Sequence, residues 1–309
     1  MIPADVKGKD ATAAPTTEPR HFTRDFFVAL TAGLIAATIL SPFAAWGLAA
    51  AGFRFPFPRV FDRTVMGTLT IALIVCARRF KPWALLRSGF AQPAAHLGQF
   101  AIGLVVALSV IAALFAIATA IGCGSLTPPA PILARAARFA AAALLIAIIE
   151  EGFFRALLLA GIKSDYGPRT ALLGSAAFYS ITHILRSPAH FYLTGFQPLA
   201  GLEDLGLSAS RLVHPSAGTP ALIGLFLLGT VLGEAFMLSG TVYFSIGLHA
   251  GFVIGAKTWP AVVDHAASVP GWLAGPGPVP LIAAPAAWVA AAAIAFTIPL
   301  LLRRQPDPR

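Results

Sequence analysis

Two adjacent glutamates and an arginine form the most informative ionisable cluster in the sequence. Glu150, Glu151 and Arg155 end a run that is otherwise rich in alanine and leucine. On a helix, an acid that precedes a base by four positions favours an ion pair, here between Glu151 and Arg155. Glu150 is turned by about 100° from Glu151, so its carboxylate is free to point into a cavity and act as a general base. The alternative interpretation is a structural Glu–Arg ion pair that joins two helices, with Glu150 merely near the interface.

Two histidines lie in other apolar runs of the chain. His249 is surrounded by small residues, among them Gly247 and Gly251, which permit close helix approach. Either histidine alone is explained by an interhelical hydrogen bond. Together, His183, His249 and Glu150 come from three segments and could converge on one water molecule, an arrangement that packing alone does not explain.

Two hydrolytic chemistries fit these residues. In the first, Glu150 and His183 activate a water molecule and His249 stabilises the oxyanion. In the second, the same three residues bind zinc, which polarises the water; the sequence contains no His-Glu-x-x-His motif. Ser180 and Ser245 lie near the histidines, but neither has the Gly-x-Ser-x-Gly context of a serine nucleophile. We expect no cofactor, with zinc as the alternative.

The composition places this chemistry in a membrane. Of the 309 residues, 57% are hydrophobic and 11% are charged, whereas a soluble domain carries roughly 25% charged residues. The apolar excess must therefore face lipid. The net charge of +9 is not concentrated in an arginine-rich stretch interleaved with aromatic residues, which argues against nucleic-acid binding. Cys76 and Cys123 indicate neither a disulfide framework nor a metal site.

The apolar runs predict an all-α, polytopic transmembrane bundle with about eight spans. A helix crosses the hydrocarbon core in roughly 20 residues. By this measure the spans lie near residues 26–50, 62–77, 97–121, 137–161, 168–185, 219–238, 241–257 and 280–302.

Four regions follow from these spans. They are a disordered cytoplasmic tail, an N-terminal group of three membrane helices, a catalytic core of four spans, and a loop with the last span and a basic tail, at residues 1–25, 26–136, 137–257 and 258–309. Within the core, the prolines of the connection 186–218 predict an outside loop with little regular structure.

Basic residues set the expected orientation. Four basic groups flank the spans: Arg20 with Arg24, Arg78 and Arg79 with Lys81 and Arg87, Lys163 with Arg169, and Arg303 with Arg304. Eight spans put all four groups on one side, which the positive-inside rule makes cytoplasmic. Two groups run against this trend, Arg54 with Arg59 and Arg186 with Arg211. Because the composition is also alanine-rich, we expect a multi-pass protein of a bacterial inner membrane with both termini in the cytoplasm.

The order of these motifs resembles that of the CPBP family of intramembrane proteases, which includes CAAX proteases and bacteriocin-processing enzymes and is also called the ABI family. The resemblance covers about residues 137–255 and rests on three motifs. These are Glu-Glu-x-x-x-Arg at Glu150, Glu151 and Arg155; Phe-x-x-x-His, with tyrosine for phenylalanine, at Tyr179 and His183; and His-x-x-x-Asn at His249, with Val253 at the asparagine position.

The resemblance implies a glutamate-type mechanism. Glu150 would be the base, assisted by His183, while Arg155 holds Glu151. His249 would form the oxyanion site, where Val253 supplies no donor. Three further polar residues are considered as replacement donors: Thr182, Ser245 and Glu234. Glu234 also stands out as the third acid well within a predicted span, where a charge costs at least about 2.5–3.5 kcal/mol.

The sequence therefore predicts an intramembrane endopeptidase that acts on a peptide or protein at or in the lipid bilayer. A leader peptide or membrane anchor is favoured over a prenylated C-terminal motif as substrate. Two alternatives remain open. One is a catalytically weak relative that serves as an immunity or scaffold protein, with Val253 as the sign of decay. The other is a proton-coupled transporter, which predicts inverted repeats that the sequence does not show. Nothing in the sequence indicates an oligomeric state.

Overall fold

The computed structural model describes residues 21–123, 130–213, 215–263, 269–276 and 281–302. Most of the predicted tail 1–25 and the basic residues after residue 302 lie outside the described residues. The described chain is built from helices: α1 (Phe22–Ala50), α2 (Phe57–Phe80), α3 (Pro82–Gly89), η1 (Pro93–His96), α4 (Leu97–Ala120), α5 (Ala130–Glu151), η2 (Gly152–Leu159), α6 (Ala160–Ile184), α7 (Ala200–Val213), α8 (Pro215–Ser239), α9 (Tyr243–Thr258), η3 (Trp259–Ala261), α10 (Gly271–Ala274) and α11 (Pro285–Leu302).

The predicted fold class, an all-α polytopic bundle, is confirmed among the described residues. Within the part of the chain that the structure describes, six helical stretches are long and apolar enough to cross a membrane. One of them, Ile132–Ile184, reverses direction at Gly167 and corresponds to two of the predicted spans. A further predicted span corresponds to α9, which has only 16 residues and is shorter than the roughly 20 residues that a perpendicular crossing requires.

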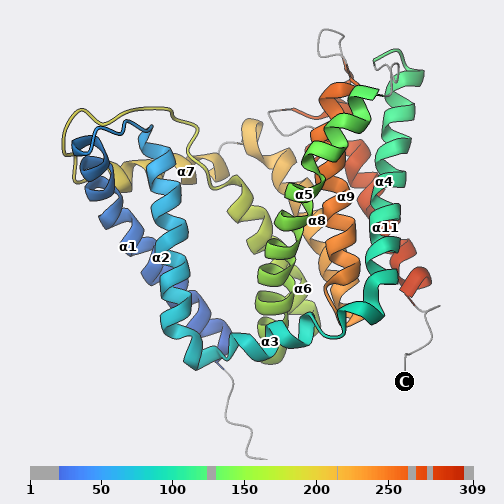
Figure 1. Cartoon of the computed structure of the whole chain (residues 1–309), viewed down its shortest axis with the longest axis horizontal. Coiled ribbons are helices and arrows are strands. Elements are labelled where there is room, and N and C mark those ends of the chain that lie inside the picture. The colour runs from blue at the N-terminus through green and yellow to red at the C-terminus, as the bar shows by residue number, and fades with distance from the viewer. Residues whose placement is uncertain (1–20, 124–129, 214, 264–268, 277–280, 303–309) are drawn as a thin grey trace, which may run out of the picture.

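The reversal at Gly167 forms a hairpin from α5 and η2 on one side and the rest of α6 on the other. Gly167 has φ 83° and ψ 176°, a backbone conformation that glycine adopts without steric cost. Pro168 follows it and lacks the N–H that would continue the helical hydrogen bonding. The two arms run in opposite directions (Figure 1). Glu150 belongs to the first arm, in α5, and His183 to the second, in α6.

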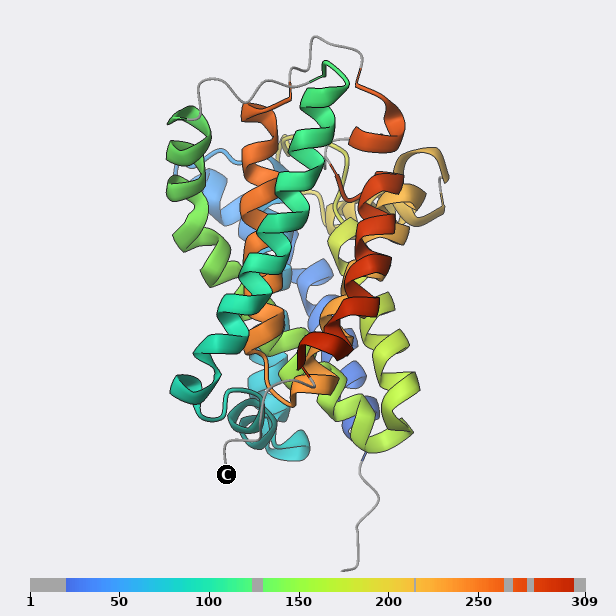
Figure 2. The same ribbon diagram turned by 90° about the vertical axis from the view of Figure 1, so that its right-hand side faces the viewer.

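The helices fall into two groups. α1 and α2 pack on each other and form a hairpin to one side, while α4, α5, α6, α8, α9 and α11 form the main bundle (Figures 1 and 2). The hairpin contacts the rest of the chain through α6 and α7 and through η2, where the ring of Phe153 lies 5.8 Å from that of Phe26.

α7 corrects the prediction that the connection 186–218 has little regular structure. It is a helix of 14 residues that lies across one end of the α1–α2 hairpin (Figure 1). Gly201 lets it approach α1, because a side chain at this position would collide with the carbonyl oxygen of Thr38. Pro198 and Pro215 mark the two ends of this helix rather than an irregular loop.

The helix ends next to the basic groups lie together. α1 begins, α2 ends, α6 turns at Gly167 and α11 ends at the same end of the molecule (Figure 1). α9 begins at this end of the molecule and runs to the opposite end (Figure 2). The helix ends that adjoin the four basic groups therefore lie on one side of the bundle.

α9 is held against α4 by glycines. A Cβ atom added at Gly247 would collide with the carbonyl oxygen of Phe100, and one added at Gly103 would collide with the carbonyl oxygen of Phe244. The two backbones are therefore in direct contact, as small residues allow in membrane helices. His249 is two residues from Gly247, so this contact sets its position.

We predict that Gly247→Leu destabilises the protein, because the side chain has to separate α9 from α4. Overpacking of this kind costs about 1–3 kcal/mol or more. The measurement is the thermal unfolding midpoint of the purified protein in detergent. Gly47→Leu on α1 is the matched control, because a Cβ atom there meets nothing within 4 Å. Equal midpoints for the two variants would contradict this account of the α4–α9 contact.

Candidate active site

The structure brings Glu150, His183 and His249 together from three helices. Glu150 Oε2 lies 3.3 Å from His183 Nε2 and 3.7 Å from His249 Nε2. These residues lie at the end of α5, near the end of α6 and in the middle of α9. Two imidazole nitrogens therefore face one carboxylate oxygen, and this oxygen has no other hydrogen-bond partner among the described residues.

The second nitrogen of each imidazole is held by an acceptor. His183 Nδ1 lies 2.8 Å from the carbonyl oxygen of Tyr179, and because a carbonyl only accepts, this nitrogen must carry a proton. His249 Nδ1 lies 2.8 Å from Glu151 Oε1 and donates in the same way when Glu151 is ionised. In a neutral ring, each Nε2 then presents a lone pair to Glu150. A proton or a water molecule between the Glu150 carboxylate and these nitrogens would give both acceptors a hydrogen bond.

Arg155, Glu151 and His249 form a buried chain of charged and polar groups. Arg155 Nε lies 3.2 Å from Glu151 Oε2, and the side chains are 2% and 0% exposed. The guanidinium also lies 4.8 Å from the ring centroid of Tyr179 and 3.4 Å from the carbonyl oxygen of Gly229. The predicted pair of Glu151 with Arg155 is present, and it also holds the imidazole of His249.

The two glutamates differ in solvent exposure. The side chain of Glu150 is 26% exposed and that of His183 is 29% exposed, whereas Glu151 is fully buried. A reacting water molecule and a substrate can therefore reach Glu150 but not Glu151.

A π-helix, η2, begins immediately after the two glutamates. It covers Gly152–Leu159, and its i→i+5 hydrogen bonds give a wider turn than an α-helix has. All of its residues except Phe153 are buried, so this segment is packed on every side. Turns of this type occur often at functional sites, and this one carries Arg155 into the bundle beneath Glu151.

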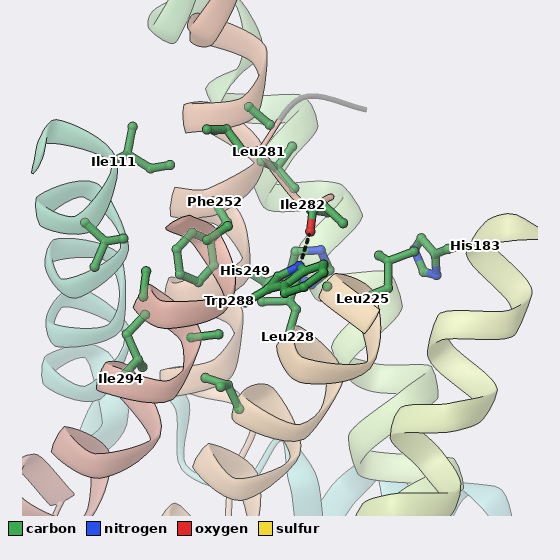
Figure 3. Close-up of a pocket in the computed structure, with 18 of the residues that line it drawn as sticks. Ile111, His183, Leu225, Leu228, His249, Phe252, Leu281, Ile282, Trp288 and Ile294 are labelled. Carbon is green, nitrogen blue, oxygen red and sulfur yellow. Dashed lines mark hydrogen bonds between the residues drawn. The ribbon is translucent and has the colours of Figure 1, made fainter. Parts of the chain in front are cut away.

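A cavity of about 410 Å³ opens beside Glu150. Figure 3 shows that its walls are mostly apolar and that His249 and His183 reach it from different helices. The Trp288 indole donates to the carbonyl oxygen of Ile282 at 3.0 Å and closes part of the wall. The lining residues outside the catalytic cluster include Ile111, Leu225, Leu228, Phe252, Leu281 and Ile294.

The replacement donors considered from the sequence do not reach this cavity. Val253 lines it and supplies no hydrogen-bond donor. Ser245 is buried and donates to the carbonyl oxygen of Val242, while Thr182 donates to carbonyl oxygens of its own helix. Neither they nor Glu234 belong to the cavity lining, because each side chain lies on another face of its helix.

Several residues of the cavity were not predicted from the sequence. Phe252, Ala256 and Lys257 follow His249 at helical spacing and line the same cavity. Their positions three, seven and eight residues after His249 form one face of a helix, so this signal was present in the sequence. Trp288 on α11 carried no comparable signal, because its place depends on how α11 packs on α8.

No group of three or more His, Cys, Asp or Glu side chains is arranged to hold a metal ion within the part of the chain that the structure describes.

We predict that Glu151→Gln and Arg155→Ala lower the yield of folded protein more than Glu150→Gln does. The first two changes leave a buried charge without its partner, which costs about 3–5 kcal/mol. Glu150 is partly exposed and has no such partner, so it serves as the control. The measurement is the monodisperse fraction in detergent by size-exclusion chromatography, and equal fractions for all three variants would contradict the assignment.

Comparison with known proteins finds a similarity to one protein family. Neither the curated proteins nor the solved structures contain a match. Residues 131–255 match the family model described as type II CAAX prenyl endopeptidase Rce1-like. This stretch contains the two glutamates, Arg155, both histidines and Val253. Residues 131–255 of this chain are therefore similar to the CAAX endopeptidases, which agrees with the resemblance that the sequence motifs indicate.

Proposed function

We propose that this protein is an intramembrane endopeptidase that hydrolyses a peptide bond of a membrane-associated peptide or protein through a water molecule activated by Glu150 and His183. One observation carries the proposal: Glu150 Oε2 faces two imidazole nitrogens, at 3.3 Å and 3.7 Å, at the wall of an apolar cavity. Such a cavity excludes bulk water but leaves room for a peptide segment.

The reaction follows from the hydrogen-bonding roles. A water molecule beside Glu150 loses a proton to the Glu150–His183 pair, and its oxygen attacks the carbonyl carbon of the substrate. His249, protonated on both nitrogens, stabilises the oxyanion, and the buried Glu151 carboxylate compensates its charge. The proton then passes to the amide nitrogen, and the C–N bond breaks. The products are a carboxylate and a protonated amine, which carries both protons of the water molecule.

The Tyr179 hydroxyl is our candidate for the second oxyanion donor, in place of the amide that Val253 does not supply. Tyr179 lines the cavity, and its ring centroid lies 4.1 Å from that of His183 and 6.4 Å from that of His249. No hydrogen bond uses its hydroxyl among the described residues. It is therefore available to donate to a substrate oxygen.

We further propose that the bilayer holds both the protein and its substrate, that the four basic groups mark the cytoplasmic side of a bacterial inner membrane, and that no cofactor takes part. A catalytically weak relative that acts as an immunity or scaffold protein is the second candidate, because Val253 lines the site without a donor.

The first experiment compares membrane and secreted proteomes of the host carrying wild-type protein or Glu150→Ala, with new protein termini read by mass spectrometry. We expect termini that appear only with wild type, since the variant lacks the base. Equal amounts of both proteins in the membrane are the control. An identical set of termini in both strains would favour the scaffold or immunity role.

We predict that Tyr179→Phe lowers the turnover of the substrate found in this way by about 10²–10³-fold, the usual loss for one oxyanion donor. KM should change little, because the donor acts mainly in the transition state. Tyr192→Phe is the control, since Tyr192 is exposed and outside the cavity. Full activity of Tyr179→Phe, with folding shown by an unchanged unfolding midpoint, would rule out this role.

A further inference from the structure

A second hollow of the molecule lies on the α1–α2 hairpin, outside the main bundle. This hairpin groove has a volume of about 400 Å³ and takes its walls from the end of α1, the connection 51–56 and the first two turns of α2. Its lining residues are Ala44, Leu48, Phe55, Arg59, Val60, Arg63 and Thr64. None of these residues lines the cavity of the catalytic cluster, so the proposed reaction leaves the groove without a role.

The floor of the hairpin groove is apolar. Ala44 and Leu48 are one turn apart on α1, and Val60 and Thr64 are one turn apart on α2. The Thr64 hydroxyl donates to the carbonyl oxygen of Val60 at 2.9 Å, so its hydrogen-bonding proton is already used within the helix. A floor of this kind suits a hydrocarbon chain rather than a polar ligand.

The rim of the groove carries two arginines that no acid pairs with. Arg59 and Arg63 are one turn apart on α2, and both side chains are exposed. The Arg59 guanidinium lies 5.5 Å from the ring centroid of Phe55, and Arg63 Nη1 lies 3.5 Å from the sulfur of Met66. Neither arginine forms an ion pair with an acid of the described chain. Their N–H groups are therefore available to an anion.

The charge around the groove stays positive when the neighbouring acid is included. Asp62 does not line the groove, and Arg186 acts on its carboxylate more strongly than Arg63 does. Arg54, which is exposed in the connection between the two helices, adds a positive charge at the same end. Arg54, Arg59 and Arg186 are among the basic residues that run against the positive-inside trend. An anionic ligand would give the charges at the groove a counter-ion.

The groove lies at the level of a membrane interface. The connection between α1 and α2 is at the end of the molecule opposite to the four basic groups (Figure 1). Trp46 lies on α1 between Ala44 and Leu48, and its side chain is 55% exposed. Tryptophan is enriched where the hydrocarbon of a bilayer meets the headgroups. The phosphate of a lipid therefore lies at the height of the two arginines.

We infer that the hairpin groove binds one anionic phospholipid, with its phosphate at Arg59 and Arg63 and an acyl chain along the apolar floor. The planar guanidinium offers N–H groups in a fork that matches the oxygens of a phosphate. Two arginines one turn apart can share one phosphate. Binding of this lipid requires neither Glu150 nor the two histidines, so the site is independent of the catalytic one.

An anionic lipid fits this groove better than a free phosphate or a zwitterionic lipid does. A free phosphate would bind the arginines but leave the apolar floor without a ligand. A zwitterionic lipid brings its own ammonium group, which competes with the arginines for the phosphate. An anionic lipid provides both the hydrocarbon chain and an uncompensated charge.

The test is a lipid titration of the purified full-length protein, stripped of lipid in a neutral detergent and followed by native mass spectrometry. Wild type should bind the first phosphatidylglycerol about ten- to a hundredfold more tightly than the first phosphatidylcholine, the range expected for hydrogen bonds between charged groups. The double variant Arg59→Gln with Arg63→Gln should bind the two lipids equally. An unchanged preference in this variant, or no preference in wild type, would overturn the inference.

The matched control is Arg78→Gln with Arg79→Gln, which removes the same charge from exposed positions at the other end of α2. It should keep the wild-type preference. If the control loses as much of the preference as the groove variant does, the net charge of the protein attracts the lipid and the groove does not.

A third variant separates a lipid from a free phosphate. Leu48→Trp fills the apolar floor and leaves both arginines in place, so it should weaken the binding of phosphatidylglycerol about tenfold or more. Its unfolding midpoint without lipid shows that it is folded. Inorganic phosphate alone should raise the midpoint of wild type less than phosphatidylglycerol does. An equal rise with phosphate that Leu48→Trp retains would assign the arginines to a free phosphate and overturn the lipid site.

Discussion

The chain of Arg155, Glu151 and His249 is the interaction on which the site depends. A carboxylate inside an apolar bundle is costly unless a cation and hydrogen bonds compensate it. Glu151 receives both, from Arg155 at 3.2 Å and from His249 at 2.8 Å. The π-helix η2 places the arginine, and the glycine contact between α4 and α9 places the histidine. Three regions of the fold are thus connected through one buried carboxylate.

This compensation lets two neighbouring glutamates differ in chemistry. Glu151 is neutralised and buried, and it serves to orient a ring. Glu150 is turned toward the cavity and faces only imidazole nitrogens. The same helix therefore presents a structural acid and a reactive acid within one turn. A site built in this way has little freedom, because Arg155, Glu151 and His249 hold one another in place.

The cavity extends this division of roles to the substrate. Its polar groups lie at the catalytic cluster and at Lys257, and the wall between them is mostly apolar. An apolar wall of this kind contributes affinity for a ligand through burial, while a few polar groups fix the orientation of that ligand.

The sequence by itself determined the helices, the membrane environment, the Glu151–Arg155 pair and the family motifs, because these depend on hydropathy and on spacing within one helix. Tertiary structure decided the rest. The contact of Glu151 with His249 joins residues 98 positions apart, and no local pattern states which ring nitrogen faces Glu150. The helix α7 was not predicted, because prolines favour loops. Here the prolines lie at the two ends of a helix. The proposed donors Thr182 and Ser245 had suitable chemistry, but the rotation of their helices turns them to backbone carbonyls. The rotation of each helix about its axis and the angles at which helices cross are set by packing between distant segments. The hydropathy of one segment does not predict them.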